Sequence, residues 1–399
     1  MSLLLLGAGG IQGTAALYDL ARSPGVQPII AADNRPEGIR ARLGEWKLRN
    51  VDVVKVDAND RGQIGSLMER AEMVVNLLPS SFSLPVARLA TEKGVSLVDS
   101  GYVVDPSRMS EPATQKTLAD LDKAAKRAGV TILRECGFDP GIDLLLCGQA
   151  ARELDVIREV KTYGSGFPES EAANNPLKYK ITWTFDGVLK SYFRGGRYLQ
   201  DGAVRAFAPE EEFAPGHVHS RIFPPFGELE SYPNGDSLAL ADELGIRDTV
   251  ASFGRFVSRW PGHAAFWYRL ANLGFLGDNP IRVGDVSISP RAFLAALLEP
   301  QLHLAPNERD VAFIVVEMKG FRDGKPRRIV YQMIDRRDLA TGFLAMQRTV
   351  GFTASIGAQL IMSGVIAGKG VISPLRDVPF DRFVQELKHR GIEITRSEE

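Results

Sequence analysis

The sequence predicts an α/β protein with a doubly wound parallel sheet in its first part and an α+β domain in its second. Three observations support this fold class. Short apolar runs alternate with helically spaced segments over the first 140 residues, and a glycine-rich turn at residues 7–13 joins the first run to the first helical segment. Beyond residue 141 the alternation ends and hairpin signals begin. Strand–helix alternation indicates parallel strands, because each parallel crossover needs about a dozen residues or more.

The predicted strands of the first part are short runs rich in Leu, Val and Ile, most of them flanked by Gly, Asp or Pro. They are residues 3–6, 28–32, 51–56, 73–77, 95–98 and 130–133. The segments between them repeat apolar residues at helical spacing. This spacing predicts helices over residues 11–22, 37–48, 61–69, 83–93 and 111–128.

The second part is predicted to hold an antiparallel sheet with helices packed on it. Asp201-Gly202 and Asp323-Gly324 are hairpin-turn sequences between strand-like runs. The expected strands are residues 156–164, 179–185, 249–260, 309–319 and 327–333, with a hairpin over 197–205. The expected helices are residues 142–154, 348–363 and 380–390.

Composition excludes several classes of function. The 399 residues include 48 Lys and Arg against 49 Asp and Glu, a balance that argues against nucleic acid and polybasic membrane partners. The two cysteines, Cys136 and Cys147, are too few for a disulfide scaffold and favour a reduced, cytoplasmic setting. The N-terminal leucine run lacks a basic flank, and no window is apolar enough to span a membrane.

The turn at residues 7–13 has the spacing of a dinucleotide-binding loop. Gly7 permits a tight turn, Gly9 lets the backbone approach a pyrophosphate, and Gly13 lets the helix pack on the strand. The helix N-terminus adds N–H groups and a positive dipole. A glycine turn without a nucleotide is the alternative, which the acidic residue at the end of the second strand disfavours. The cofactor contacts expected here are Gly7, Gly9, Gly10, Ile11 and Gln12.

Asp33 ends the second predicted strand, twenty residues after Gly13. A carboxylate at this place accepts both ribose hydroxyls of NAD and repels the 2′-phosphate of NADP. Arg35 could instead pair with a 2′-phosphate, stack on the adenine or face solvent. We predict NAD as the cofactor, with NADP as the alternative, and contacts from Asp33, Asn34 and Arg35.

Polar or small residues also follow the next three strands, where a parallel sheet binds its ligands. Asp57 and Ala58 are expected at the adenine, and residues 76–78 at the nicotinamide ribose. Tyr102 could reach the nicotinamide or the substrate, or could pack internally. The alternative for each is an ordinary loop. The cofactor contacts predicted from these strand ends are Asp57, Ala58, Asn76, Leu77, Leu78, Ser100 and Gly101.

Asp139 lies after the sixth strand, at the same carboxyl edge of the predicted sheet. From the residues alone, a helix N-cap is its favoured role and a ligand contact the alternative. Cys136 has no histidine near it in sequence, which favours a buried structural thiol over a nucleophile. His217 and His219 lack a carboxylate partner pattern, so we predict a surface loop and no metal site.

The chain resembles the saccharopine dehydrogenase family, in particular its glutamate-forming reductases and the related lysine 6-dehydrogenases. The resemblance covers essentially the whole chain. Beyond the glycine turn, the matching motifs are Asn76 to Pro79, Gly137 to Asp143, Asn175 to Lys180 with Trp183, Tyr232 to Ser237, Asn307 to Asp310 and Thr349 to Phe352.

The resemblance implies a Rossmann domain that the C-terminal helices complete, with an α+β substrate domain inserted between. The expected boundaries are 1–140, 141–345 and 346–399. It also implies nicotinamide-linked oxidation of the CH–NH bond of an amino-acid derivative in lysine metabolism, most directly saccharopine. A homodimer through the inserted sheet is implied as well.

The resemblance also implies site roles. Asp139 and Tyr102 would be the catalytic residues, with Asp139 near the substrate amine. The residues that would line the substrate pocket are Asn175, Lys180, Trp183 and Asn234.

One departure from the family concerns the substrate. Gly235 stands where the reductases carry an arginine that clamps a substrate carboxylate. Either Arg194, Arg197 or Arg255 replaces that arginine, or the substrate differs. A lysine 6-dehydrogenase or carboxynorspermidine dehydrogenase-like reaction, and a non-catalytic dinucleotide-binding protein, are therefore the alternative functions.

Overall fold

The computed structural model describes residues 2–26, 28–104 and 111–399, which form two compact units. Unit 1 contains Met1–Gly148 and Gln347–Glu393, and unit 2 contains Gln149–Met346 and Ile394–Glu399. The sequence placed the first boundary at 140 and assigned the whole C-terminal segment to the first domain. In the structure the last six residues belong to unit 2, because they form a strand of its sheet.

Unit 1 contains a seven-stranded parallel sheet in the order β17-β6-β5-β4-β1-β2-β3. Successive strands run outward from β1 in both directions, so the strand order reverses beside β1, as the doubly wound prediction requires. All four leucines of β1 are completely buried. The strands are β1 (Leu3–Leu6), β2 (Ile29–Asp33), β3 (Val51–Lys55), β4 (Met73–Asn76), β5 (Ser96–Asp99), β6 (Thr131–Leu133) and β17 (Gly370–Ile372).

The helices of unit 1 include two from the C-terminal segment. Gly351 of α11 packs against the backbone of α1 so closely that a Cβ there would lie 2.6 Å from the Gln12 carbonyl oxygen. Asp19 of α1 accepts hydrogen bonds from Ser355 and Arg390 at 2.6 and 2.8 Å. The helices are α1 (Ile11–Leu20), α2 (Pro36–Trp46), α3 (Arg61–Met68), α4 (Ser83–Lys93), α5 (Glu111–Ala128), α6 (Ile142–Arg152), α11 (Ala345–Met362) and α12 (Phe380–His389).

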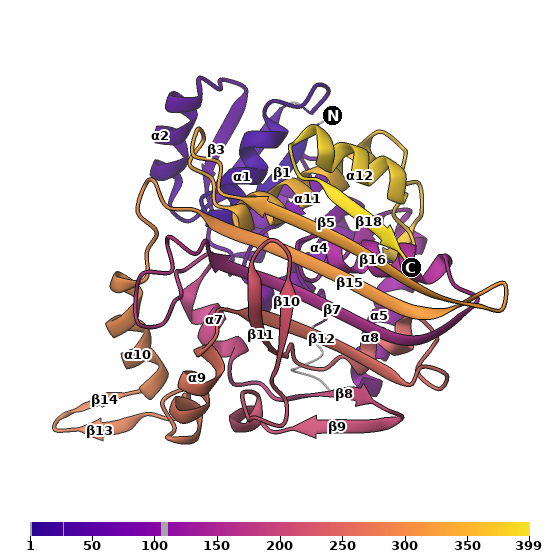
Figure 1. Cartoon of the computed structure of the whole chain (residues 1–399). Helices are drawn as coiled ribbons and strands as arrows, with labels where there is room; N and C mark the ends of the chain where they lie inside the picture. Colours follow the sequence, from indigo (N-terminus) through magenta and orange to yellow (C-terminus); the bar gives the residue numbers. More distant parts are fainter. Residues whose placement is uncertain (1, 27, 105–110) are drawn as a thin grey trace. The chain divides into compact units, whose positions relative to one another are not determined.

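Unit 2 contains a mixed sheet in the order β10-β11-β12-β7-β15-β16-β18, with β8 and β9 attached at β12 (Figure 1). The prediction of an antiparallel sheet is wrong for one pair, since β12 runs parallel to β7. The chain between these two strands is long enough for a parallel crossover. The strands are β7 (Val156–Pro168), β8 (Gly196–Gln200), β9 (Ala203–Phe207), β10 (His219–Phe223), β11 (Gly227–Pro233), β12 (Ser252–Arg259), β15 (Asp310–Arg322), β16 (Lys325–Arg336) and β18 (Ile394–Glu398).

The remaining elements of unit 2 include a small separate sheet. A hairpin of β13 (Ile281–Val283) and β14 (Val286–Ile288) pairs with no other strand of the described chain. The predicted strand over 179–185 is wrong: this stretch is irregular and ends where a helix begins at Phe185. The helices are α7 (Phe185–Ser191), α8 (Leu238–Glu243), α9 (His263–Asn272) and α10 (Pro290–Leu298).

Both predicted hairpin turns are present. Asp201 and Gly202 have positive φ angles of 51° and 78°, and Asp323 and Gly324 have 52° and 70°. Two consecutive residues with positive φ form the turn that matches the twist of the flanking strands. Within the described part of the chain, no helix combines the length and apolar character needed to cross a membrane.

Candidate functional site

The glycine turn of unit 1 has the close backbone contacts that a nucleotide loop requires. Gly7 has a φ of 76°, and its N–H donates to the Ala32 carbonyl at 3.0 Å. A Cβ at Gly13 would lie 2.0 Å from the Gly7 carbonyl oxygen, so only glycine fits there. The N-cap of α1 is Gly10, which has no side chain to cap the first N–H groups. The turn is therefore shaped to present helix N–H groups to an anionic group.

Asp33 is fixed against this turn. Its Oδ2 accepts the Gly9 N–H at 2.9 Å, and its Oδ1 accepts the Arg35 N–H at 2.9 Å. A Cβ at Gly9 would lie 3.0 Å from the Asp33 Cγ. Asn34 and Arg35 are exposed. The structure thus brings Asp33 and the glycine turn together, as the sequence predicted for a dinucleotide site.

The ends of β3 and β4 contribute two further predicted positions. Asn59 donates its backbone N–H and its side-chain amide to Asp57 Oδ1, both at 2.9 Å. These hydrogen bonds lower the pKa of Asp57. A Cβ at Gly7 would lie 2.7 Å from the Leu77 carbonyl oxygen, so residues 76–78 run directly beside the glycine turn.

Asp99, at the end of β5, is a residue for which the sequence suggested no role. Its side chain is buried, with 2% of the residue exposed. It accepts hydrogen bonds from the Asn76 amide at 2.6 Å, the Gly101 N–H at 2.9 Å and the Ser83 hydroxyl at 3.1 Å. Burial outweighs these three donors and raises the pKa of Asp99 to about 6. Asp99 therefore ties the loop after β4, the start of α4 and the loop after β5 together.

Asp139 and Tyr102 are both half-buried in unit 1. Asp139 follows β6, and the backbone folds back immediately after it, since a Cβ at Gly141 would lie 2.0 Å from the Gly137 carbonyl oxygen. The Gly141 N–H donates to Asp143 Oδ1 at 2.7 Å, so Asp143 serves the local turn that begins α6. Cys136 is completely buried, and burial with the nearby Asp99 raises the pKa of its thiol. This agrees with the predicted structural thiol.

In unit 2, the predicted substrate residues of the first motif are engaged in internal contacts. Asn175 Oδ1 accepts the N–H groups of Leu177 and Tyr179 at 3.0 and 3.3 Å, and its amide donates to the Tyr179 carbonyl at 2.7 Å. Lys180, 8% exposed, is paired with Glu308 at 3.2 Å. These contacts hold an irregular segment in place and explain the absence of the predicted strand over 179–185.

Trp183 also has a close structural neighbour. A Cβ at Gly187 would lie 2.5 Å from the Trp183 ring, so the indole packs on the first turn of α7. The substrate roles of Asn175, Lys180 and Trp183 remain predictions, and each side chain has a role in packing.

The loop after β11 brings Asn234 and an arginine together. Arg194 donates to the Asn234 side-chain oxygen, and its guanidinium lies against Gly235. A Cβ at Gly235 would be 3.0 Å from Arg194 Nε and 3.1 Å from Arg194 Cζ. Arg197 is paired with Asp236 at 2.6 Å, and Arg255 is buried at 5% exposure. Of the three arginines that the sequence offered, Arg194 therefore reaches the glycine position with its charge exposed.

A buried polar cluster lies beside this loop in unit 2, and it includes His263, which the sequence offers as a weak acid–base candidate. The Tyr192 hydroxyl and His263 Nε2 are 2.9 Å apart, and the rings of Tyr192 and Tyr232 meet edge to face. Glu212, 1% exposed, accepts the Arg194 N–H at 3.5 Å. Burial raises the pKa of Glu212 to about 8, against the lowering effect of Arg194. The backbone N–H of Arg194 is therefore bonded to the buried carboxyl group of Glu212.

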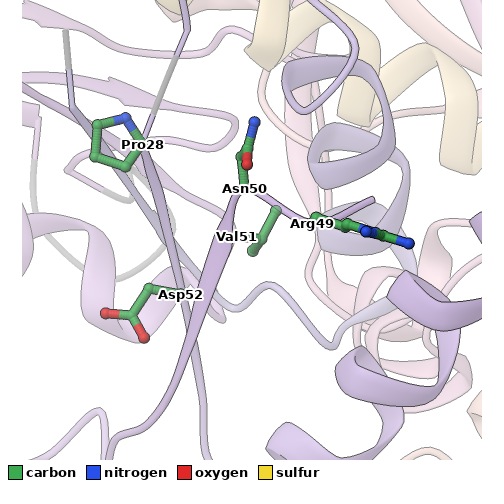
Figure 2. A pocket seen from close by; sticks show the side chains of 5 residues that line it. All are labelled: Pro28, Arg49, Asn50, Val51 and Asp52. Carbon is green, nitrogen blue, oxygen red and sulfur yellow. The ribbon is translucent and has the colours of Figure 1, made fainter. Parts of the chain in front are cut away.

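A depression of about 580 Å³ lies at the start of β2 and β3 (Figure 2). In Figure 2 the Arg49 and Asp52 side chains point away from each other, so they do not converge on one ligand. This is the amino edge of the parallel sheet, opposite the carboxyl edge that holds Asp33 and Asp99. Over residues 2–26, 28–104 and 111–399, no group of three or more His, Cys, Asp or Glu side chains is placed to hold a metal ion.

Two family models match the chain. Residues 3–133 match the saccharopine dehydrogenase NADP binding domain, and residues 137–392 match the saccharopine dehydrogenase C-terminal domain. A solved structure with a similar fold is apo saccharopine dehydrogenase (L-Glu forming) from Saccharomyces cerevisiae. Its TM-score is 0.83 at 22% identity, covering 100% of this chain and 99% of that one.

Characterised relatives are distant in sequence but match along most of the chain. Saccharopine dehydrogenase [NADP(+), L-glutamate-forming] of Pyricularia oryzae is 24% identical, covering 98% of each protein. Carboxyaminopropylagmatine dehydrogenase of Synechocystis is 23% identical, covering 98% of this chain and 96% of the relative. Alpha-aminoadipic semialdehyde synthase of Mus musculus is 24% identical, and the chain spans 47% of its length.

Proposed function

The chain belongs to the saccharopine dehydrogenase family, and from this premise we propose that it oxidises the CH–NH bond of an amino-acid-derived secondary amine with a nicotinamide dinucleotide. The proposed substrate is saccharopine, and the products are glutamate and aminoadipate semialdehyde. The reverse reaction is part of the same proposal. We also propose that the protein is cytoplasmic, as its composition leads us to expect.

The chemistry balances with water as the second reactant. A hydride leaves the carbon of the C–N bond, the nitrogen loses a proton, and a C=N bond forms in the substrate. Water then adds to that carbon, the C–N bond breaks, and an aldehyde and a primary amine are released. The dinucleotide, when bound, accepts the hydride. The chain must therefore supply an acid–base group for the amine and the water, and a cation for the carboxylates.

The observation that carries the proposal is that both family domains match in order, and the close contacts of the glycine turn in the first domain support it. Gly7, Gly9 and Gly13 permit the close contacts of this turn with Leu77, Asp33 and the Gly7 carbonyl. Absorbance of the reduced nicotinamide, followed with saccharopine, lysine and carboxynorspermidine in turn, tests the reaction class. Turnover of saccharopine supports the proposal, whereas dinucleotide binding without turnover of any of the three would refute it.

For the cofactor we propose NAD. The names of the matched domain and of the fungal relatives contain NADP, which favours NADP over NAD. Asp33 supports NAD, because its carboxylate is fixed by Gly9 and Arg35 next to the turn and would repel a 2′-phosphate. Asp33→Ala should lower the preference for NAD over NADP at least about tenfold. An unchanged ratio of kcat/KM for the two cofactors would remove Asp33 from cofactor selection.

For the acid–base group we propose Asp139, with Tyr102 as a second contact to the substrate. The half-buried Asp139 follows β6 at the carboxyl edge of the sheet in unit 1, the edge where such sheets bind ligands. Asp139→Asn should abolish turnover and leave NADH affinity unchanged, measured by fluorescence titration. Retained turnover in this variant would exclude the proposed role.

For the carboxylate clamp we propose Arg194. Its guanidinium lies against Gly235, where it occupies the space of the missing side chain and is held by Asn234. Arg194→Ala should raise the KM for saccharopine roughly 10- to 100-fold, the effect of losing a charge-assisted hydrogen-bond pair, with a smaller change in kcat. Arg205→Ala, which removes another exposed arginine of unit 2, is the matched control.

A second candidate function is the oxidation of a carboxyalkylated polyamine or agmatine. The match to carboxyaminopropylagmatine dehydrogenase along 98% of the chain favours it, and so does Gly235. Such a substrate carries fewer carboxylates and more cationic nitrogen than saccharopine. A kcat/KM higher for carboxynorspermidine than for saccharopine would decide for this candidate.

A further inference from the structure

A small pocket lies in unit 2 between two segments that are distant in sequence. Its volume is about 50 Å³. One wall is the irregular stretch that precedes Tyr179, and the other is formed by the loop before α9 and the first turns of that helix. The pocket is lined by residues 176–178, residues 261–263, Phe266 and Trp267. The glycine turn belongs to unit 1, so this pocket is not part of the proposed dinucleotide site.

Trp267 brings an unused hydrogen-bond donor to this pocket. Its side chain is completely buried, and no acceptor within residues 2–26, 28–104 and 111–399 pairs with its Nε1–H. A buried N–H without an acceptor is costly, and most such groups in folded proteins have a partner. Because Trp267 lines the pocket, an acceptor bound there would supply the partner that the indole lacks.

His263 provides a second donor. Its Nε2 lies 2.9 Å from the Tyr192 hydroxyl. Arg259, whose guanidinium has donors only, also bonds to the Tyr192 oxygen, so the Tyr192 O–H proton is directed at Nε2. Burial and the charge of Arg259 lower the pKa of His263 well below its usual value. The ring is therefore neutral and carries its own proton on Nδ1, the nitrogen that is left for the pocket.

Lys178 adds a positive charge at the rim of the pocket. It is exposed, and its backbone has a positive φ of 48°. Its N–H donates to the Asn175 carbonyl at 2.9 Å, which holds the turn. Across the described part of the chain its ammonium group forms no ion pair. The charge of Lys178 is therefore available to an anion in the pocket.

The carboxylate next to the pocket is already engaged. Glu230 of β11 accepts the Gly262 N–H at 3.1 Å with one oxygen and the Ala264 N–H with the other. These bonds satisfy the start of α9, so the donors of the pocket are side-chain groups and do not come from the helix N-terminus. The negative charge of Glu230 opposes a second anion nearby, and the positive charge of Lys178 offsets it.

The lining of the pocket indicates the class of ligand. Two N–H donors without an acceptor, beside an ammonium group, suit the oxygens of a carboxylate. The other walls are apolar and come from Pro176, Leu177, Pro261 and Phe266. A water-sized group needs about 10–15 Å³, so about 50 Å³ accommodates about three to five non-hydrogen atoms. Saccharopine is far larger than this.

We propose that this pocket binds a short aliphatic monocarboxylate, of the size of acetate or propionate. The carboxylate oxygens accept hydrogen bonds from the side chains of Trp267, His263 and Lys178. The alkyl end lies against Pro261 and Phe266. This site is distinct from the proposed reaction, and binding there requires neither the dinucleotide nor saccharopine.

Ligand-observed NMR on the full chain, with propionate as the probe, tests the proposal. The wild type should bind propionate saturably, with a dissociation constant of the order of millimolar, as expected for so few atoms. Trp267→Phe keeps an aromatic ring and removes the N–H, and Lys178→Asn removes the charge at a φ that suits asparagine. Each should raise the dissociation constant roughly tenfold or more. Thermal unfolding checks that both variants fold, and the exposed position of Lys178 keeps the test decisive if Trp267→Phe does not.

Lys47→Asn is the matched control, because Lys47 is also an exposed lysine with a positive φ, 56°, and lies outside the pocket. It should bind propionate like the wild type, and propionamide, which has the same shape without the charge, should bind roughly tenfold more weakly. Absence of saturable propionate binding would overturn the proposal, as would equal binding of propionamide. So would unchanged binding in Lys178→Asn, or displacement of propionate by saccharopine, which would place propionate in the substrate site.

Discussion

Replacing Asp99 by asparagine should remove a pH-dependent cost to the stability of the folded chain and at the same time weaken its binding of the dinucleotide. Burial raises the pKa of Asp99 from 3.8 to about 6. A pKa that is higher in the folded state means that the ionised form disfavours folding. The cost is absent below pH 3.8, grows between pH 3.8 and 6, and is complete above pH 6. At about 1.4 kcal/mol per pH unit it reaches about 3 kcal/mol.

The amide introduced by Asp99→Asn carries no charge, so the substitution removes this cost. The difference in unfolding free energy, variant minus wild type, should therefore rise with pH. Between about pH 4.5 and 7.5 we expect a rise of about 2 kcal/mol, since part of the cost is already present at the lower pH. Urea unfolding of both proteins at the two pH values measures it. A difference that does not change with pH would refute the reasoning.

The same substitution should impair the cofactor site. Asp99 Oδ2 accepts a hydrogen bond from the Asn76 side-chain NH₂ at 2.6 Å. An asparagine at position 99 would place its own NH₂ group against that of Asn76, unless one of the two side-chain amides rotates by 180°. If the Asn76 amide rotated, its Oδ1 could no longer accept the hydrogen bond from the Leu78 N–H, which lies 3.4 Å away in the structure. We expect roughly tenfold weaker NADH binding by fluorescence titration, the effect of one lost hydrogen bond. Asp57→Asn is the control for the stability measurement. Hydrogen bonds lower the pKa of the exposed Asp57, so the difference in unfolding free energy, variant minus wild type, should fall with pH instead of rising.

Three further predictions concern single side chains. Gly13→Ala should abolish NADH binding, because its Cβ would lie 2.0 Å from a carbonyl oxygen of the turn, whereas Gly38→Ala in α2 has free space and should bind normally. Glu212→Gln should raise the melting temperature more at about pH 8.5 than at pH 6, because burial raises the Glu212 pKa from 4.5 to about 8 and the ionised form disfavours folding. Lys180→Met should lower the unfolding free energy by about 1–3 kcal/mol, since it leaves Glu308 without its cation. Equal stability of this variant in urea would contradict a structural role for Lys180.

The strands and helices of unit 1 could be predicted from sequence because each is strongly patterned. The helix at Glu111–Ala128 has the predicted bounds, and most of the others differ by one or two residues. The seventh strand, β17, was not predictable in this way. It has three residues and begins at a glycine, and it depends on pairing with β6 and on the Val371 N–H bond to Asp122 at 2.9 Å. Both partners are more than 200 positions away in sequence.

The sequence suggested the residues of the proposed cofactor site from local spacing alone, since the glycine turn and Asp33 belong to one strand–helix–strand unit. Asp99 and Glu212 required the fold, because their burial and their partners come from distant segments. The predicted strand at 179–185 failed for a related reason. Its apolar and aromatic residues suit a strand, but the Asn175 side chain bonds to the backbone on both sides of Tyr179 and holds a turn.

The edge strand β18 has a consequence for how the sheet of unit 2 can associate. It pairs with β16 and carries Arg396 and Glu398, which pair with each other and with Glu153 and Arg327. Another strand that approached this edge would have to displace these ion pairs, so the edge is protected against aggregation. Removing residues 394–399 would uncover β16, whose Ile329, Tyr331 and Met333 are buried. We would expect such a truncated chain to aggregate by adding strands from other molecules at this edge.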